Sequence, residues 1–427
     1  MVSISRIGSL LTGLAVDITP LRRSRDFRFL FGGQIVNLIG SQLTLVALPY
    51  QVFLLTHSSL WVGLLAGAQL IPLLSFSLIG GSIADIVDRR KLLAITQVLL
   101  ACSSAMLAVA AWVGHTPLWY LFAVAIISAC VQAIAQPTYR AVIPQLVPRD
   151  QMTNAMALNQ LVNQSGRISG AALAGLVLAA FGVRWSYTLD ALTFGVAVFA
   201  LMKMSPMPAE EQGSFRDRFS AIAEGLSFLK KRPVLMSTFL VDINATFFGG
   251  PSALYPALAL TIFHVGPQGL GFLYAAPGAG AFLGALVTGW AKNVRHQGMA
   301  TILLICVWGA AIACFGLINH WFLLALVFLG IAGAADTWSA LFRSAMLQAA
   351  LPDRMRGRIS AVHFMSVTGG PRLGAMESGT VAALTNVQVS IVSGGLLSVA
   401  GALLIGLAVP AYARYDAKKA IAEAPVG

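Results

Sequence analysis

The chain has 427 residues, of which 57% are hydrophobic and only 10% are charged. A soluble globular protein carries about 25% charged residues, so this composition excludes that class and indicates a polytopic membrane protein. The formal net charge of +12 does not indicate nucleic-acid binding, because the basic residues concentrate on one side of the expected membrane spans. By the positive-inside rule that side faces the cytoplasm, and both termini are expected there.

Twelve apolar stretches are long enough to cross a bilayer, which takes about 20 residues each. The predicted fold class is therefore all-α, with twelve transmembrane helices in two six-helix bundles. The outer connections are very short, as in Thr56-His57-Ser58. The predicted spans are residues 27–55, 59–83, 91–113, 116–138, 154–182, 184–204, 234–262, 266–291, 299–319, 320–349, 359–385 and 389–413.

The longest polar stretch divides the spans six and six. Apolar residues recur in it at helical spacing beside basic ones, which predicts an amphipathic helix on the inner membrane surface. The first residues of the chain show a similar apolar face and are expected to lie on the same surface. The predicted units are the N-terminal segment 1–26, a bundle 27–204, a linker 205–233, a bundle 234–413 and a tail 414–427.

The two halves resemble each other in sequence. Residues 61–67 match residues 269–275, and Arg140 and Gln145 after the fourth span recur as Arg343 and Gln348 after the tenth. Repeated halves around a central pathway are typical of secondary transporters.

A charged hairpin, residues 81–91, joins the second and third spans. A basic loop of this kind can serve only as a topological anchor. The pattern Gly81-x-x-Ala84-Asp85-x-x-Asp88-Arg89-Arg90-Lys91 indicates more than an anchor, because it resembles the loop between helices 2 and 3 of the major facilitator superfamily. Residues 139–149, 254–258, 271–276 and 346–358 are similar to the subfamily of the enterobactin exporter and related drug–proton antiporters.

This resemblance covers nearly the whole chain and implies the major facilitator fold, with a gate at the cytoplasmic side. Asp85 is expected near the start of span 11, where a helix N-terminus and basic side chains attract it. The fourth span keeps only Gln132 of the antiporter motif, so the coupling mechanism does not follow from the resemblance. The residues assigned to the gate are Gly81, Asp85, Asp88, Arg89, Arg90, Arg140, Arg343, Arg356 and Arg358.

Acids within the spans are functional candidates, because a charge in hydrocarbon is costly. Four occur: Asp190, Asp242, Asp336 and Glu377. In the major facilitator arrangement spans 1, 4, 7 and 10 line the cavity, which makes Asp242 and Asp336 the candidates for proton coupling. Asp242 is preferred, since Arg372 is expected at the depth of Asp336 and would neutralise it. The alternative is that Asp242 only forms hydrogen bonds within the bundle.

Arg167 and Asp190, on spans 5 and 6, are expected to form a buried ion pair. Without that pair, Arg167 becomes a candidate for binding an anionic substrate. Gly249-Gly250-Pro251 and Gly369-Gly370-Pro371 interrupt helix hydrogen bonding and indicate either gating bends or close helix packing. The side chains assigned to the substrate cavity, with bundle core as the alternative, are Phe247, Phe248, Tyr255, Trp338, Gln34 and Asn37.

Together these features predict a proton-antiporting exporter of a siderophore or amphipathic drug, working by alternating access in the inner membrane. The alternatives are a multidrug pump without a siderophore role and a receptor that does not transport. The sequence contains no phosphate loop, H-E-x-x-H or nucleophile elbow, so neither ATP as the driver nor an enzyme is expected. The four cysteines lack ligand spacing, and no metal, cofactor or nucleic-acid partner is expected. The expected partners are the solute, protons and lipid, and the expected state is a monomer.

Overall fold

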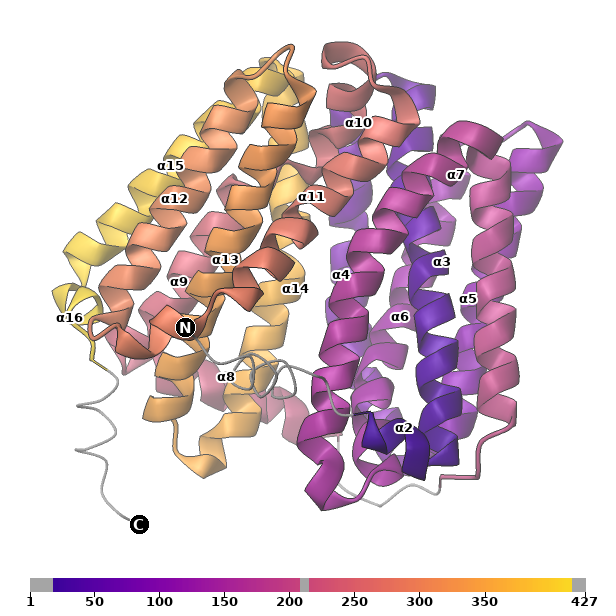
Figure 1. Cartoon of the computed structure of the whole chain (residues 1–427), viewed down its shortest axis with the longest axis horizontal. Coiled ribbons are helices and arrows are strands. Elements are labelled where there is room, and N and C mark those ends of the chain that lie inside the picture. The colour runs from indigo at the N-terminus through magenta and orange to yellow at the C-terminus, as the bar shows by residue number, and fades with distance from the viewer. Residues whose placement is uncertain (1–17, 208–214, 417–427) are drawn as a thin grey trace, which may run out of the picture.

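The computed structural model describes residues 18–207 and 215–416. The short α2 (Thr19–Arg23) leads into α3 (Arg25–Thr56), α4 (Ser59–Ile86), α5 (Arg89–Val113) and α6 (Leu118–Leu146). These long helices run back and forth through the N-terminal half (Figure 1), followed by the short η1 (Arg149–Gln151) and by α7 (Met152–Met202). Residues 1–17 of the predicted N-terminal segment 1–26 fall outside the described residues.

Helix α7 supplies two crossings, because it reverses direction at Gly182. This residue has φ 76° and ψ −176°, a conformation that is open to glycine but not to residues with a Cβ. The first part of α7 therefore runs parallel to α3 and the second part antiparallel to it. The packed pairs that fix these directions are Leu38–Gly166 and Gln42–Gly170 in the first part, and Gly33–Ala200 and Gly40–Thr193 in the second.

The C-terminal half begins with α8 (Phe215–Lys230), which lies in the predicted linker. The first crossing of this half, which is the seventh of the chain, is interrupted: α9 (Pro233–Phe248) ends at the Gly-Gly-Pro motif. The crossing continues as η2 (Pro251–Leu254), α10 (Tyr255–Ala257) and η3 (Leu258–Ile262). The bundle is completed by α11 (Gly266–Leu286), η4 (Gly289–Asn293), α12 (Gln297–Leu317), α13 (Phe322–Ala350), α14 (Asp353–Leu384), α15 (Val387–Ala408) and α16 (Pro410–Ala413).

The two Gly-Gly-Pro motifs differ in their effect. The first ends a helix, which is one of the two alternatives that the sequence left open, whereas α14 continues through Pro371 without interruption. At the second motif the glycines serve close packing, since Gly370 and Gly374 both lie against Thr246 of α9.

Nine helices of the described residues are long and apolar enough to cross a membrane. The second crossing of α7, the broken segment from α9 to η3, and the more polar α14 complete the twelve crossings that the sequence predicts. The predicted all-α class and the two-bundle fold are confirmed.

The two halves meet at glycines. Gly175 of α7 lies against Gly271 of α11, and Gly63 of α4 lies against Ala375 of α14. A Cβ on Gly63 would come within 2.6 Å of the Ala375 carbonyl oxygen, so these helices pack with their backbones nearly touching. By the direction of their helices, all four residues lie toward the end of the molecule that holds the Gly182 bend.

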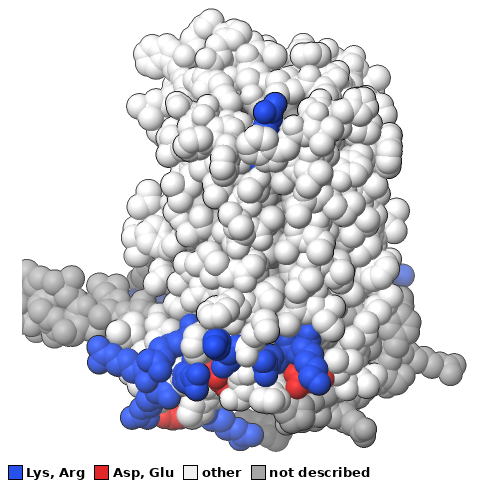
Figure 2. Space-filling view, turned by 90° about the vertical axis from the view of Figure 1, so that its right-hand side faces the viewer, with Lys and Arg blue, Asp and Glu red and all other residues white. Residues whose placement is uncertain are grey.

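Basic side chains mark the opposite end, which we call the charged end. It holds the turn at Val87–Asp88, η1 and α8. Figure 2 shows Lys and Arg gathered there below an almost uncharged body. A membrane protein of this shape places its apolar body in lipid and its basic end at the headgroups.

Candidate functional site

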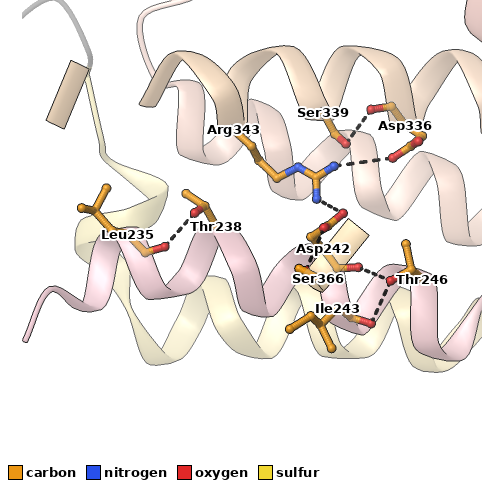
Figure 3. A network of polar contacts seen from close by, with 9 residues as sticks. All are labelled: Leu235, Thr238, Asp242, Ile243, Thr246, Asp336, Ser339, Arg343 and Ser366. Atoms are coloured by element: carbon orange, nitrogen blue, oxygen red, sulfur yellow. Dashed lines mark hydrogen bonds and ion pairs between the residues drawn. The ribbon is translucent and has the colours of Figure 1, made fainter. Parts of the chain in front are cut away.

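One arginine in the C-terminal half contacts two acids (Figure 3). The Arg343 guanidinium of α13 forms an ion pair with Asp242 of α9, and its Nη2 lies 3.6 Å from Oδ1 of Asp336. Ser366 of α14 donates a hydrogen bond of 3.2 Å to the Asp242 carboxylate. We call these four residues the Arg343 network, and it joins α9, α13 and α14.

Local helix geometry assembles half of this network. Asp336 and Arg343 are seven residues apart, which places them two turns apart on one face of α13. Asp242 comes from the last two turns of α9, before the helix ends at Phe248. The hydroxyl of Thr246 donates to the Asp242 carbonyl oxygen at 2.9 Å, which supports the helix where the following break removes backbone hydrogen bonds.

The members of the network differ in their access to water. The side chains of Arg343 and Asp242 are 7% and 8% exposed, whereas that of Asp336 is 53% exposed. Because a carboxylate facing lipid within a membrane helix is costly, we infer that Asp336 faces water. The network therefore runs from the water-exposed Asp336 through the buried Arg343 to the buried Asp242.

The charges of the network do not balance when both acids are ionised, because two carboxylates share one guanidinium. A single proton on either acid leaves one anion for one cation, which suits a buried site better. Beside the Asp242–Arg343 contact lies a cavity of about 10 Å³, lined in part by Thr238 and His363. That space is close to the volume needed for one water molecule.

Asp190 is the corresponding buried acid of the N-terminal half, and its predicted pairing with Arg167 is wrong. Its Oδ2 accepts hydrogen bonds from Thr44 at 2.5 Å and Ser104 at 2.7 Å, and Oδ1 has no partner. The physical reason is the bend at Gly182. Counting helix rise from it, Arg167 lies about 22 Å down one arm and Asp190 about 12 Å down the other.

The predicted neutralisation of Asp336 by Arg372 is also wrong. Arg372 donates to the carbonyl oxygen of Thr368 in its own helix at 3.0 Å, and the cation beside Asp336 is Arg343. Arg343 was grouped with Arg140 at the gate on the basis of the sequence repeat, but it lies buried among acids instead. The ground for ranking Asp336 below Asp242 is thereby removed. Glu377 is half-buried, and its Oε2 is buried without a partner.

The hairpin residues of the expected gate contact their own half. Asp88 caps α5 by accepting from the Lys91 amide at 3.1 Å and also accepts from the Met207 amide at 3.2 Å. Arg89 donates to the carbonyl oxygen of Ala141, and Arg90 to those of Leu201 and Met202. These contacts tie the charged ends of α5, α6 and α7 together.

Three other members of the expected gate contact the second half or belong to it. The Arg140 guanidinium of α6 stacks over the ring of Phe364 of α14, 5.5 Å from its centroid, and thus bridges the halves. Arg358 pairs with Glu224 of α8 at 3.0 Å. Arg356 is exposed. The surroundings of Gly81 and of the Asp85 side chain lie outside the described residues.

The side chains assigned to the substrate cavity fall into two groups. Tyr255 is 5% exposed and packs edge-to-face on Tyr274, and the Trp338 indole donates to the Gly284 carbonyl oxygen at 2.8 Å, so both serve helix packing. Phe247 and Phe248, in mutual edge contact, are only partly buried. Gln34 and Asn37 of α3 are also partly buried.

On the N-terminal side, Gln34 contacts a polar residue of α7, whereas Asn37 has no such contact at its amide oxygen. Gln34 donates to Oδ1 of Asn159 at 3.0 Å, and Oδ1 of Asn37 is buried without a partner. Sequence reasoning did not find Ser366, Thr44 or Ser104, because nothing in an isolated serine or threonine indicates which acid it will meet. The seven-residue spacing of Asp336 and Arg343 was visible and could have indicated that pair.

Comparison with known proteins places the chain in a family. The sequence pattern of the transmembrane secretion effector family matches residues 15–426. The enterobactin exporter EntS of Shigella boydii serotype 18 is 28% identical over 91% of this chain and 93% of its own. EntS of Escherichia coli O1:K1 / APEC is also 28% identical, with the same coverage.

A solved structure supports the fold independently. The nucleoside transporter NupG, crystallised as a point mutant, superposes with a TM-score of 0.71 at 15% identity. The match covers 91% of this chain and all of that one. Since the family and these relatives are transporters, the prediction that the chain is not an enzyme is confirmed. The chain belongs to the transmembrane secretion effector family of the major facilitator superfamily, and it is similar over most of its length to the enterobactin exporter.

Proposed function

We propose that this protein exports a siderophore-like or amphipathic solute across the inner membrane by proton antiport and alternating access. The observation that carries the proposal is the Arg343 network, in which two acids share one buried cation. The names of the relatives support a siderophore as the solute. The basic charged end supports a cytoplasmic placement of that end and of both termini.

Proton entry is assigned to Asp336, since its side chain is the exposed acid of the network. A proton that passes on to Asp242 weakens the attraction between α9 and Arg343 and leaves Arg343 paired with Asp336. α9 is then held to α13 and α14 by fewer charge contacts. Protonation thus alters the contact between three helices without leaving a buried charge unpaired.

The break after α9 offers a route from the network to the contact between the halves. Ser378 of α14 donates to the carbonyl oxygen of Gly250 at 3.1 Å, and η2 packs against both α4 and α14. A shift of α9 is thereby transmitted to the helices through which the halves meet. The glycine contacts hold the halves together at the end opposite the charged end, which supports a proposed opening toward the cytoplasm.

The test uses the full chain in proteoliposomes with an imposed pH gradient and enterobactin as the solute. Asp242→Asn is expected to abolish uphill transport while sparing exchange of solute down its own gradient, since it removes the proton site and not the solute site. Asp336→Asn is expected to slow proton-driven transport in the same assay. Asp190→Asn is the matched control, an acid-to-amide change in the half without an arginine network.

The results also separate the alternatives. Full pH-driven transport by Asp242→Asn would place the coupling acid elsewhere. Transport of the amphipathic dye ethidium but not of enterobactin would make the protein a multidrug pump. Binding of either solute without flux would make it a receptor.

A further inference from the structure

A histidine of α14 that has no part in the Arg343 network lies beside the buried acid of that network. The small cavity next to the Asp242–Arg343 contact is completed by Thr238, Phe239, Leu347 and His363. Phe239 and Leu347 are apolar, and the Thr238 hydroxyl already donates to a carbonyl oxygen of its own helix at 2.7 Å. A hydroxyl and a guanidinium do not take up and release protons near neutral pH, whereas an imidazole does. His363 is therefore the lining side chain suited to exchange a proton with Asp242 through a water in the cavity.

His363 is placed against α9 by two contacts that are one helical turn apart. The imidazole lies at 75° to the ring of Phe239, with 6.1 Å between the ring centroids. Three residues later on the same face of α14, Ser366 donates to the Asp242 carboxylate. Phe239 and Asp242 are likewise three residues apart on α9, so the imidazole and the carboxylate occupy neighbouring turns of one helix contact. Among the residues that the structure describes, none forms a hydrogen bond with the imidazole, which leaves its ring nitrogens open to water.

The imidazole lies between Asp242 and the charged end. The start of α9 meets the end of α13 there, because Arg232, just before α9, donates to the last carbonyl oxygen of α13 at 3.4 Å. Counted from that contact, helix rise places Phe239 at about 10 Å, Asp242 at about 15 Å and Asp336 at about 21 Å. The imidazole of His363 is at the level of Phe239, so it is nearer the charged end than either acid. The acid assigned to proton entry and the histidine therefore lie on opposite sides of Asp242.

A row of polar residues leads from the imidazole to the charged end. Ser360 and Arg356 lie three and seven residues nearer the start of α14 on the same side of the helix, and both are exposed. His363 is partly buried, and Ser366 is buried. Exposure thus falls stepwise along one side of α14 from the charged end to Asp242.

The charges around the imidazole favour the passage of a proton over its storage. The charged groups that act on it are Asp242, Arg343 and Arg140, and Arg140 is also brought there by its stacking on Phe364, the next residue of α14. While Asp242 holds a proton, two cations face His363 and keep the imidazole neutral, so it is able to accept. After the transfer, the new carboxylate is paired by Arg343, and repulsion from Arg140 drives the proton onward.

We propose that His363 is the relay through which the proton of Asp242 leaves toward the water at the charged end. The Asp242 carboxyl gives its proton to a water in the cavity, and that water gives another proton to one ring nitrogen of the imidazole. The other ring nitrogen then loses its proton to water at the charged end, so one proton has moved and the imidazole is neutral again. The inference rests on the proposed function and deepens it, because it names the exit of the coupled proton.

The first test measures proton release by the detergent-solubilised full chain when enterobactin binds, with a pH indicator in weakly buffered solution and stopped-flow mixing. His363→Gln is expected to release as many protons as the wild type but about tenfold or more slowly, since glutamine fills the site and forms hydrogen bonds without carrying a proton. Asp242→Asn is expected to release none, because the proton site itself is lost. The matched control is His320→Gln, an exposed histidine in the turn between α12 and α13 at the opposite end, and it is expected to behave as the wild type.

Flux in proteoliposomes supplies a second readout that a merely structural role would not reproduce. His363→Gln is expected to lower the maximal rate of pH-driven enterobactin transport about tenfold. The enterobactin concentration at half-maximal rate and the exchange of solute down its own gradient are expected to stay as in the wild type, which also shows that the variant is folded.

The outcomes separate the relay from the function on which it rests. Proton release or pH-driven flux at the wild-type rate in His363→Gln would overturn the relay. A smaller extent of release, or a loss of downhill exchange, would also overturn it, because either result indicates a structural role. Failure of the proposed function looks different: the wild type itself then releases no proton and is not driven by the gradient, and the relay falls with it.

Discussion

In the N-terminal half the buried carboxylate of Asp190 is held by the hydroxyl groups of Thr44 and Ser104. In the C-terminal half the buried carboxylate of Asp242 is held by the Arg343 guanidinium. Hydroxyl groups donate or accept, so they suit both the ionised and the protonated acid. A guanidinium only donates, and a proton on its partner weakens the contact. Two halves with related sequences therefore differ in sensitivity to protonation.

The largest expected effect comes from removing the cation that distinguishes the halves. Arg343→Gln leaves two acids without their partner and is expected to cost about 3–5 kcal/mol of stability in the buried limit. The sequence repeat places Arg140 at the position equivalent to Arg343. Arg140→Gln loses an exposed contact with Phe364 and is expected to cost about 0.5–1 kcal/mol of stability. Thermal or denaturant unfolding of the detergent-solubilised protein measures both. Equal losses of stability in the two variants would show that Arg140 and Arg343 contribute equally to the folded state, against this expectation.

A smaller effect is expected at Asp190. Asp190→Ala leaves the hydroxyls of Thr44 and Ser104 without their shared acceptor and is expected to cost about 1–3 kcal/mol. Asp190→Asn keeps an acceptor oxygen of similar shape and is expected to recover most of that loss. The comparison is made by the same unfolding measurement, with proton-driven flux as a second readout. If Asp190→Asn abolishes flux while the protein stays folded, the N-terminal half also takes part in proton coupling.

The smallest effect is expected in a double-mutant cycle between Arg167 and Asp190. Since the bend at Gly182 separates them, Arg167→Gln and Asp190→Asn should act independently, with a coupling energy within about 0.5 kcal/mol of zero. Stability of the two single variants and the double variant gives this quantity. A coupling of several kcal/mol would restore the ion pair predicted from the sequence.

The candidate site was only partly predictable. Asp242 and Asp336 stood out because acids are rare in apolar spans, and that signal is local. The partner assignments failed at Arg167, Arg372 and Arg343. Each depended on the rotation and depth of one helix relative to another, which a linear count of residues does not contain.

The sequence by itself determined the all-α class and the twelve crossings, because the apolar length of a span acts within one segment. The tertiary structure alone decided that α14 runs straight through its own Gly-Gly-Pro motif, with Gly370 packed against Thr246. It also decided which arginine serves which acid. A buried charge pairs with whatever the packing of several helices brings within reach, and that packing is settled by all of their contacts together.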